Sequence, residues 1–130
     1  MQSPFYQAAV EAIQGFYDAG VELWISRQVL REYLATLTRP QKFTALLPIT
    51  IVIQDIRYFQ SRFQVAEDGS QVTERLLTLM EEISSGGKQV HDANIVATML
   101  VYGIPQLLTH NTGDFARFSE LITVLPLLQE

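Results

Sequence analysis

The sequence predicts an α/β domain of three layers, in which a mostly parallel sheet is covered by helices on both faces. Short apolar runs alternate with longer segments whose apolar residues recur at helical spacing, and this alternation favours parallel strands joined by helices. The composition is 48% hydrophobic and 18% charged, which is typical of a chain with a packed core. Because no linker, repeat or low-complexity tract interrupts the pattern, we expect residues 1–130 to form a single domain.

The first half of the chain is expected to contain three helices and two strands. A helix that starts after Ser3 should stop at Gly20, because glycine suits the end of a helix. Ser26 is a suitable N-cap for the next helix. The segment that begins near Thr50 is ambiguous. Its first residues are β-branched, which favours a strand, but its later apolar residues follow a period near 3.6 and indicate a helix. The expected helices are 4–19, from Ser26 to about 37, and from about Thr50, and the expected strands are 21–25 and 63–66.

The second half continues the alternation. Ser70 is a candidate N-cap for a helix that Gly86 and Gly87 should stop. The segment from His91 to Tyr102 is almost continuously small or apolar, which predicts a deeply buried helix. The remaining expected elements are a strand at 106–109, a polar loop at 111–114, a helical turn at 115–119 and a last strand at 121–125.

Three acidic residues fall near the places where such a sheet binds ligands. In open parallel sheets, ligands bind outside the carboxyl ends of the strands. Glu32 lies in the second turn of the helix after the 21–25 strand, Asp114 ends the loop after the 106–109 strand, and Asp92 opens the buried helix. Each acid alone is also explained as a helix N-terminal carboxylate or a surface residue. A site is favoured because Glu32 flanks an apolar stripe and Asp92 introduces a helix too apolar to be peripheral.

The chemistry of these acids indicates a hard cation. The chain has no cysteine, so it offers neither a thiolate metal site nor a cysteine nucleophile. Carboxylate oxygens suit Mg²⁺ or Mn²⁺, and such ions commonly act on phosphate esters. Hydrolysis of a phosphodiester is therefore the expected reaction. An unrelated phosphotransfer domain lacks support because the sequence has no glycine-rich phosphate loop.

Charge and apolar runs limit the partners and the location. The net charge of −5 gives no long-range attraction to nucleic acid, although a divalent cation reverses the charge locally. Four basic residues, Arg27, Arg31, Arg39 and Lys42, crowd one stretch, and their simplest explanation is a solvated helix face. The densest apolar run, 46–53, is too short for a membrane span. The N-terminus has no basic leader, so we expect a cytoplasmic protein without a membrane partner.

Several motifs resemble those of PIN-domain ribonucleases, specifically the VapC-like toxin type. The resemblance covers nearly the whole chain and is strongest in its C-terminal half. The matching stretches are HDA at 91–93 and IVA at 95–97, LLTHNTGDF at 107–115, VLP at 124–126, and ISRQVLREY at 25–33 followed by TRP at 38–40. The resemblance implies a PIN-like α/β/α fold and an Mg²⁺- or Mn²⁺-dependent endoribonuclease that hydrolyses single-stranded RNA.

The resemblance also assigns residues and partners. It makes Glu32, Asp92 and Asp114 three of the four acids that bind the metal, and it makes Thr109 and Asn111 polar residues that shape the site. Thr109 and Asn111 also have a simpler explanation, which is that they satisfy backbone groups of the loop. His91 is better explained as a neighbour or a cap than as a ligand. The implied partners are RNA, an antitoxin protein if the chain is the toxin half of a pair, and a second copy in a homodimer.

The chain departs from the family at its start. PIN domains open with a central strand that carries the first aspartate of the site, and neither precedes the helix that begins at Pro4. We expect the missing carboxylate to weaken metal binding and to lower activity. The unpaired neighbouring strands would need a strand from another chain, a closed-up sheet or a natural start upstream of Met1. The alternative function is a catalytically inactive PIN-like module that binds a protein.

Overall fold

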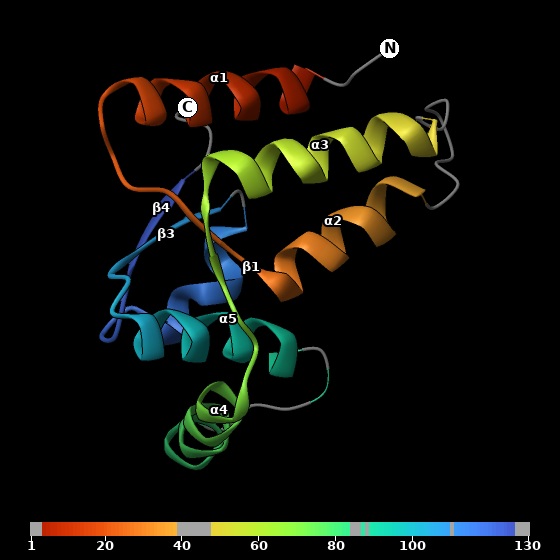
Figure 1. The fold of residues 1–130 in the computed structure, drawn as a ribbon. Helices are drawn as coiled ribbons and strands as arrows, with labels where there is room; N and C mark the ends of the chain where they lie inside the picture. Colours follow the sequence, from red (N-terminus) through yellow and green to blue (C-terminus); the bar gives the residue numbers. More distant parts are fainter. Residues whose placement is uncertain (1–3, 39–47, 84–86, 88, 110, 127–130) are drawn as a thin grey trace. The chain divides into compact units, whose positions relative to one another are not determined.

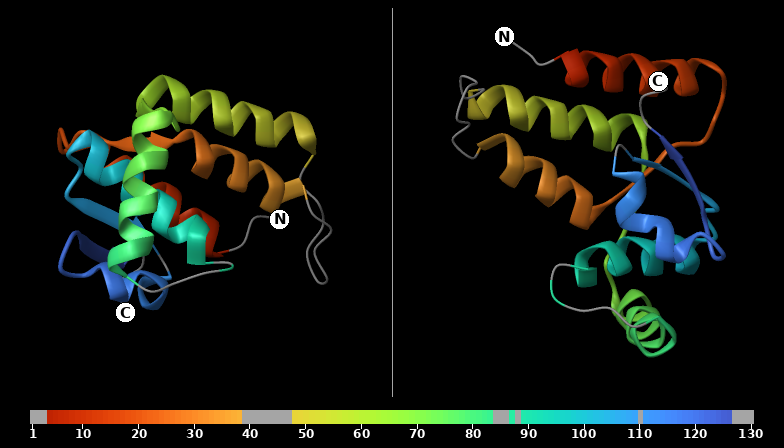
Figure 2. Two further views of the ribbon diagram at one scale, coloured as in Figure 1. Left: turned by 90° about the horizontal axis from the view of Figure 1, so that it is seen from below. Right: turned by 180° about the vertical axis from the view of Figure 1, so that it is seen from behind.

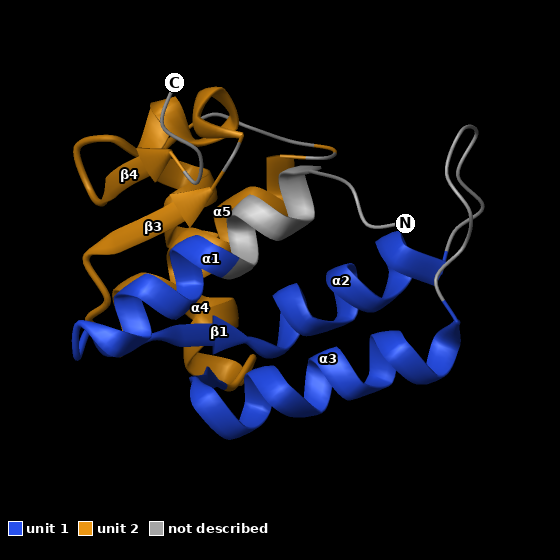
Figure 3. Cartoon of the chain, turned by 90° about the horizontal axis from the view of Figure 1, so that it is seen from above, with its two compact units in different colours: residues 1–66 blue, residues 67–130 orange. Residues whose placement is uncertain are grey.

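The computed structural model describes residues 4–38, 48–83, 87, 89–109 and 111–126, with side chains from residue 11 onward. The chain divides into two compact units, Met1–Ala66 and Glu67–Glu130, and each is described by itself (Figure 3). Helices and short parallel strands alternate in both units, so the α/β class expected from the sequence is confirmed. The arrangement of all 130 residues as one domain stays a prediction.

The elements follow the expected order along the chain (Figure 1). Unit 1 contains α1 (Pro4–Asp18), β1 (Trp24–Ser26), α2 (Arg27–Thr38), α3 (Ile49–Arg62) and β2 (Gln64–Ala66). Unit 2 contains α4 (Ser70–Glu82), α5 (Gln89–Tyr102), β3 (Gln106–Thr109), the 3₁₀ helix η1 (Thr112–Phe118) and β4 (Thr123–Pro126). The ambiguous segment after Pro48 is a helix, as its 3.6-residue period indicated.

The strands form two parallel pairs over the described part of the chain. In unit 1, β1 pairs with β2 so that Trp24 lies opposite Gln64. In unit 2, β3 pairs with β4 so that Gln106 lies opposite Thr123 and Thr109 lies opposite Pro126. The expected parallel pairing is confirmed within each unit, and these four strands form two two-stranded sheets. Each pair brings the carboxyl ends of its two strands to the same edge.

Two glycines lie at helix ends, and the sequence indicated Gly20 as one of these stops. Gly20 has a φ of 81° and Gly103 a φ of 71°, in the left-handed region that favours glycine. The Val21 N–H donates to the Phe16 carbonyl at 3.0 Å, and the Ile104 N–H donates to the Met99 carbonyl at 2.9 Å. These bonds satisfy carbonyls that have no partner within the helix. Gly103 directly follows α5 and Gly20 lies two residues after α1, so each helix ends where a glycine adopts a positive φ.

Of the two serines expected as N-caps, Ser26 caps its helix and Ser70 does not. The Ser26 Oγ accepts a hydrogen bond from the Val29 N–H at 3.1 Å, so Ser26 caps α2. Ser70 is instead the first residue of α4, and the cap position is held by Gly69, which makes no side-chain cap bond. The prediction for Ser70 was wrong because Gly69 is extended and its carbonyl accepts from the Thr73 N–H, which starts the helix one residue earlier.

The polar loop expected at 111–114 is shorter in the structure. The 3₁₀ helix η1 begins at Thr112 and runs to Phe118, so it includes residues expected in the loop and most of the helical turn expected after it. The early start follows from burial, because Phe115 and Phe118 are 5% and 1% exposed and lie on η1. Gly86, one of the two expected helix stops, lies outside the described residues.

The core of unit 2 is built around α5. This helix packs against α4 and η1 (Figure 1). Its residues Ala93, Val96 and Ala97 are fully buried. Their neighbours in the core come from the other two helices and from the turn before β4: Val72, Leu79, Phe115, Phe118 and Ile122. The prediction of a deeply buried helix is therefore confirmed. Its burial fixes the position of the first turn, in which Asp92 lies.

Unit 1 is held together by contacts between α2 and α3, which lie side by side (Figure 2). The rings of Tyr33 and Phe59 meet edge to face, with centroids 5.3 Å apart. The Tyr33 hydroxyl donates to the Asp55 carboxylate at 2.8 Å, and Val52 of α3 is fully buried. These contacts fix the path of α2.

In the described ranges, no helix has the length and apolar character needed to cross a membrane.

The two serines make a matched test of the cap. We expect Ser26→Ala to lower the free energy of unfolding by about 1 kcal/mol, because the Val29 N–H loses its acceptor. Ser70→Ala is the control and should change stability by less than about 0.5 kcal/mol, because Ser70 does not cap α4. Urea denaturation followed by circular dichroism measures both variants. Equal losses in the two variants would contradict the assignment of the caps.

Candidate functional site

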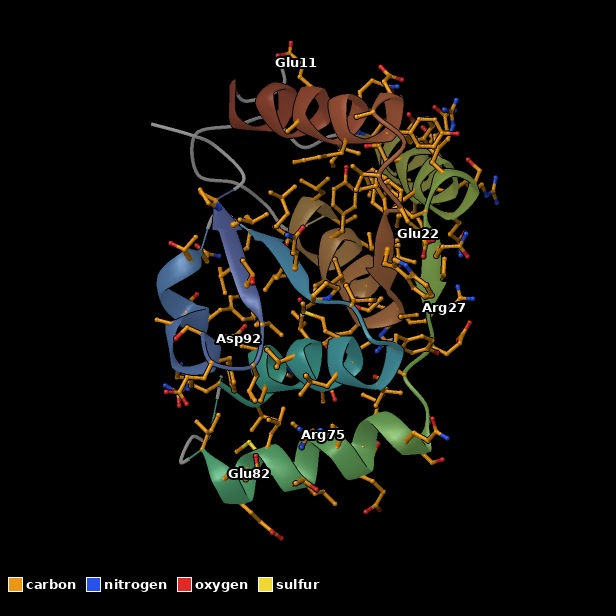
Figure 4. All side chains as sticks on the ribbon, turned by 90° about the vertical axis from the view of Figure 1, so that its left-hand side faces the viewer. Glu11, Glu22, Arg27, Arg75, Glu82 and Asp92 are labelled. Carbon is orange, nitrogen blue, oxygen red and sulfur yellow. The ribbon has the colours of Figure 1, made fainter. Side chains whose placement is uncertain are left out.

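Asp92 lies in the first turn of α5 and is half-buried (Figure 4). A carboxylate at the start of a helix is stabilised by the unpaired backbone N–H groups and by the helix dipole. The next residue, Ala93, is fully buried, so the backbone that carries Asp92 is held by the core of unit 2. The structure therefore gives Asp92 a fixed position at the beginning of the most buried helix.

The loop after β3 links three of the predicted site residues. Thr109 ends β3, and its Oγ1 accepts a hydrogen bond from the Asn111 N–H at 3.1 Å. The Asn111 carbonyl in turn accepts from the Asp114 N–H at 3.0 Å. These two bonds satisfy backbone groups of the loop, as the simpler explanation of Thr109 expected. They also connect the end of the strand to Asp114, whose side chain is exposed.

The core couples the segments that carry Asp92 and Asp114. Phe115 follows Asp114 directly and is 5% exposed, and Ala93 follows Asp92. Both apolar residues belong to one cluster of buried side chains, in which α5 contacts η1. Each acid is thus one residue away from the same buried cluster. The packing of Ala93 and Phe115 in that cluster fixes the backbone next to Asp92 and Asp114.

Glu32 lies on α2 in unit 1, and its side chain is exposed. Its Oε1 accepts a hydrogen bond from the Nε2 of Gln28 at 3.1 Å. Gln28 is a polar side chain with only 6% exposure, one turn before Glu32 on the same helix. The motifs of the sequence did not identify Gln28. The signal that was available is the i, i+4 spacing of the two residues, which places them on one face of a helix.

The predicted site residues fall into both units. Unit 2 contains Asp92, Asp114, Thr109 and Asn111, whereas Glu32 belongs to unit 1. Neither unit, over its described residues, gathers three or more histidine or acidic side chains that could hold a metal ion. The combination of Glu32, Asp92 and Asp114 in one site therefore stays a prediction.

The remaining residues that the sequence suggested for the site region lie at or near the surface where they are described. His91 is exposed in the first turn of α5, one residue before Asp92. Arg27 is half-buried at the start of α2, and Arg31 is exposed. Arg39 and Lys42 lie outside the described residues. The explanations of His91 as a neighbour of Asp92 or a cap, and of Arg31 as part of a solvated helix face, stay predictions.

The donor set fits a hard divalent cation. Asp92 and Asp114 supply carboxylate oxygens, and Thr109 and Asn111 add hydroxyl and amide oxygens in the same unit. Mg²⁺ prefers such oxygen ligands and is often held by one or two carboxylates, with water completing its coordination. The chemistry of these side chains is therefore suited to Mg²⁺ or Mn²⁺ and unsuited to a soft metal.

The hydroxyl of Thr109 can be tested apart from any activity. We expect Thr109→Val to speed hydrogen exchange of the Asn111 amide about fivefold, because the lost hydrogen bond contributes about 1 kcal/mol. The matched control is Thr123→Val on the paired strand β4, where the threonine is exposed. Amide exchange measured by NMR checks both. An unchanged rate at Asn111 would show that the hydroxyl does not hold this loop.

No family model matches the chain. Two curated proteins do match it, and both are named Ribonuclease VapC48, from the CDC 1551 / Oshkosh and the ATCC 25618 / H37Rv strains of Mycobacterium tuberculosis. Each is 27% identical to the chain over 121 residues, which cover 89% of this chain and 81% of the relative. The similarity thus extends over most of both proteins. The alternation of helices and short parallel strands in the structure is compatible with a PIN-like α/β fold.

Proposed function

We propose that this protein is a PIN-type endoribonuclease that hydrolyses phosphodiester bonds of single-stranded RNA and depends on Mg²⁺ or Mn²⁺. The observation that carries the proposal is the similarity to Ribonuclease VapC48 over 89% of the chain. It is supported by the position of Asp92 at the start of a buried helix and by the hydrogen-bonded loop that carries Asp114.

In this proposal the acids Glu32, Asp92 and Asp114 hold the metal ion. When bound, the ion neutralises charge on the phosphate and lowers the pKa of a water molecule. The role of the protein is to present the carboxylates without rearrangement, because a displacement of about 1 Å can reduce a rate on the order of a hundredfold. The burial of Ala93 and Phe115 serves this role by fixing the backbone beside Asp92 and Asp114.

Thr109 and Asn111 have a structural part in the same proposal. The Thr109 hydroxyl accepts from the Asn111 N–H, and the Asn111 carbonyl accepts from the Asp114 N–H. These bonds fix the backbone position of Asp114 relative to the end of β3. Because these groups act through Asp114, they are positioning residues and not catalytic ones. Their removal should reduce the rate less than removal of a carboxylate.

The proposal extends to partners. The toxin half of a toxin–antitoxin pair is inhibited by a protein that binds it, and we include an antitoxin protein and a second copy of the chain as partners. Large apolar side chains that are exposed on α3 provide surface for such contacts: Ile49, Ile51, Ile53 and Tyr58. A cytoplasmic location follows from the same proposal, because the RNA substrate is found there.

Cleavage of RNA tests the proposal. The full chain should cut single-stranded RNA slowly in the presence of Mn²⁺ or Mg²⁺, and EDTA should stop the reaction. Asp92→Asn should lower the rate on the order of a hundredfold or more, which equals about 2.7 kcal/mol of barrier, because a metal ligand is lost. Gel analysis of a fluorescently labelled RNA measures the rate.

The matched control is Glu81→Gln, which removes the same charge from an exposed position on α4. Its rate should equal that of the unchanged protein. Cutting that persists in Asp92→Asn would reveal a contaminating nuclease or a different site and would contradict the assignment. A wild-type chain that cuts no RNA with either metal would contradict the nuclease and favour an inactive module that binds a protein.

A further inference from the structure

Gln28 is a buried polar side chain whose hydrogen-bond donor faces an exposed carboxylate. Its Nε2 lies 3.1 Å from Oε1 of Glu32, and the residue is 6% exposed. Buried amides are normally satisfied by backbone groups or by other buried side chains. Here a donor of a buried amide is directed outward, along α2, to an acid at the surface.

The chemistry of the contact determines its direction. An ionised carboxylate only accepts hydrogen bonds, so the amide nitrogen of Gln28, and not its oxygen, must face Glu32. The contact uses one position on Oε1 and leaves the other carboxylate oxygen available to a cation. Because the donor is neutral, it orients the carboxylate without cancelling its charge, which an arginine at the same position would do.

The first turn of α2 holds Gln28 in place. Ser26 caps the helix at the end of β1, and Leu30 is 5% exposed. Gln28 lies between these two fixed points, and its own burial restricts its rotamers. Glu32 is exposed and has no such restriction, so an unassisted glutamate would lose conformational freedom when it bound a cation.

We propose that Gln28 is a positioning residue, which holds the Glu32 carboxylate in the orientation that binds the metal ion. This inference rests on the proposed function, in which Glu32 is a metal ligand. Groups that orient metal ligands through a hydrogen bond commonly change metal affinity on the order of 10- to 100-fold when they are removed. A purely structural role would instead make Gln28 a filler of space within α2.

The test compares Mn²⁺ binding by the full chain, measured by electron paramagnetic resonance, in four variants. Gln28→Met keeps the length of the side chain and removes the amide, and we expect it to weaken Mn²⁺ binding on the order of tenfold. Glu32→Gln should weaken binding at least as much. The double variant should bind no more weakly than Glu32→Gln alone, because the amide acts only through the carboxylate. Gln71→Met, on an exposed position of α4, is the control and should bind as the wild type does.

Each outcome decides a different claim. If Gln28→Met binds Mn²⁺ as the wild type does, or if it weakens binding equally with and without Glu32, the positioning role is overturned and the nuclease proposal is untouched. If Glu32→Gln has no effect while the wild type binds Mn²⁺, Glu32 is not a ligand and this inference falls, but the nuclease proposal stands on Asp92 and Asp114. If the wild type binds no Mn²⁺, the metal-dependent nuclease proposal and this inference fail together.

A second measurement does not require Gln28→Met to fold. In the NMR spectrum of the metal-free chain, Glu32→Ala should shift the side-chain amide signals of Gln28 and speed their exchange with water, because the acceptor is gone. The side-chain amide of Gln71 should not change. Unchanged Gln28 signals would show that the hydrogen bond is absent in solution and would overturn the inference.

Discussion

The burial of α5 is the constraint on which the rest of unit 2 depends. A helix with apolar residues on almost every side is stable only when other elements cover it, and here α4 and η1 do so. Phe118, Phe115 and Leu79 are large buried side chains of this cover, and Phe118 and Leu79 are both only 1% exposed. The same packing determines where η1 lies.

This constraint explains why two acids lie beside a core. Asp92 precedes Ala93, and Asp114 precedes Phe115, and both apolar residues are buried in the same cluster. Polar residues at the ends of buried segments can be held rigidly without being buried themselves. A metal site needs this combination, because its ligands must meet both the ion and water. The fold therefore holds the backbone at Asp92 and Asp114 rigidly, without requiring that their carboxylates be fully buried.

Much of the fold could be predicted because local signals determine it. The period of the apolar residues located the helices, and Gly20 and Gly103 ended two of them through the positive φ that glycine tolerates. Ser26 capped a helix as expected, but Ser70 did not, because the choice between Gly69 and Ser70 depends on backbone geometry that the sequence pattern does not encode. Strand pairing depends on contacts distant in the sequence, so the division into two parallel pairs was not predicted from the residues.

The candidate site was predictable in part for the same reason. Asp114 follows a strand, Glu32 lies on the helix after a strand, and Asp92 opens a buried helix, and these places made the three acids candidates. Their role in one site stays a prediction. The contribution of Gln28 was missed because a glutamine on a helix has no distinct pattern, and only the structure shows that it is buried and faces Glu32. The hydrogen bonds through Thr109 and Asn111 were foreseen as backbone contacts, but the link that they make to Asp114 was not.

The central proposal, which the sequence predicts and the structure does not test, is that Glu32, Asp92 and Asp114 bind one metal ion. The most direct measurement is a titration of the full, isotope-labelled chain with substoichiometric Mn²⁺, followed by NMR, since the ion broadens signals of nearby residues. We predict that backbone signals next to all three acids lose intensity together and that excess Mg²⁺ restores them. Broadening beside Asp92 and Asp114 without Glu32, or broadening confined to other acidic residues such as Glu81, would contradict this claim.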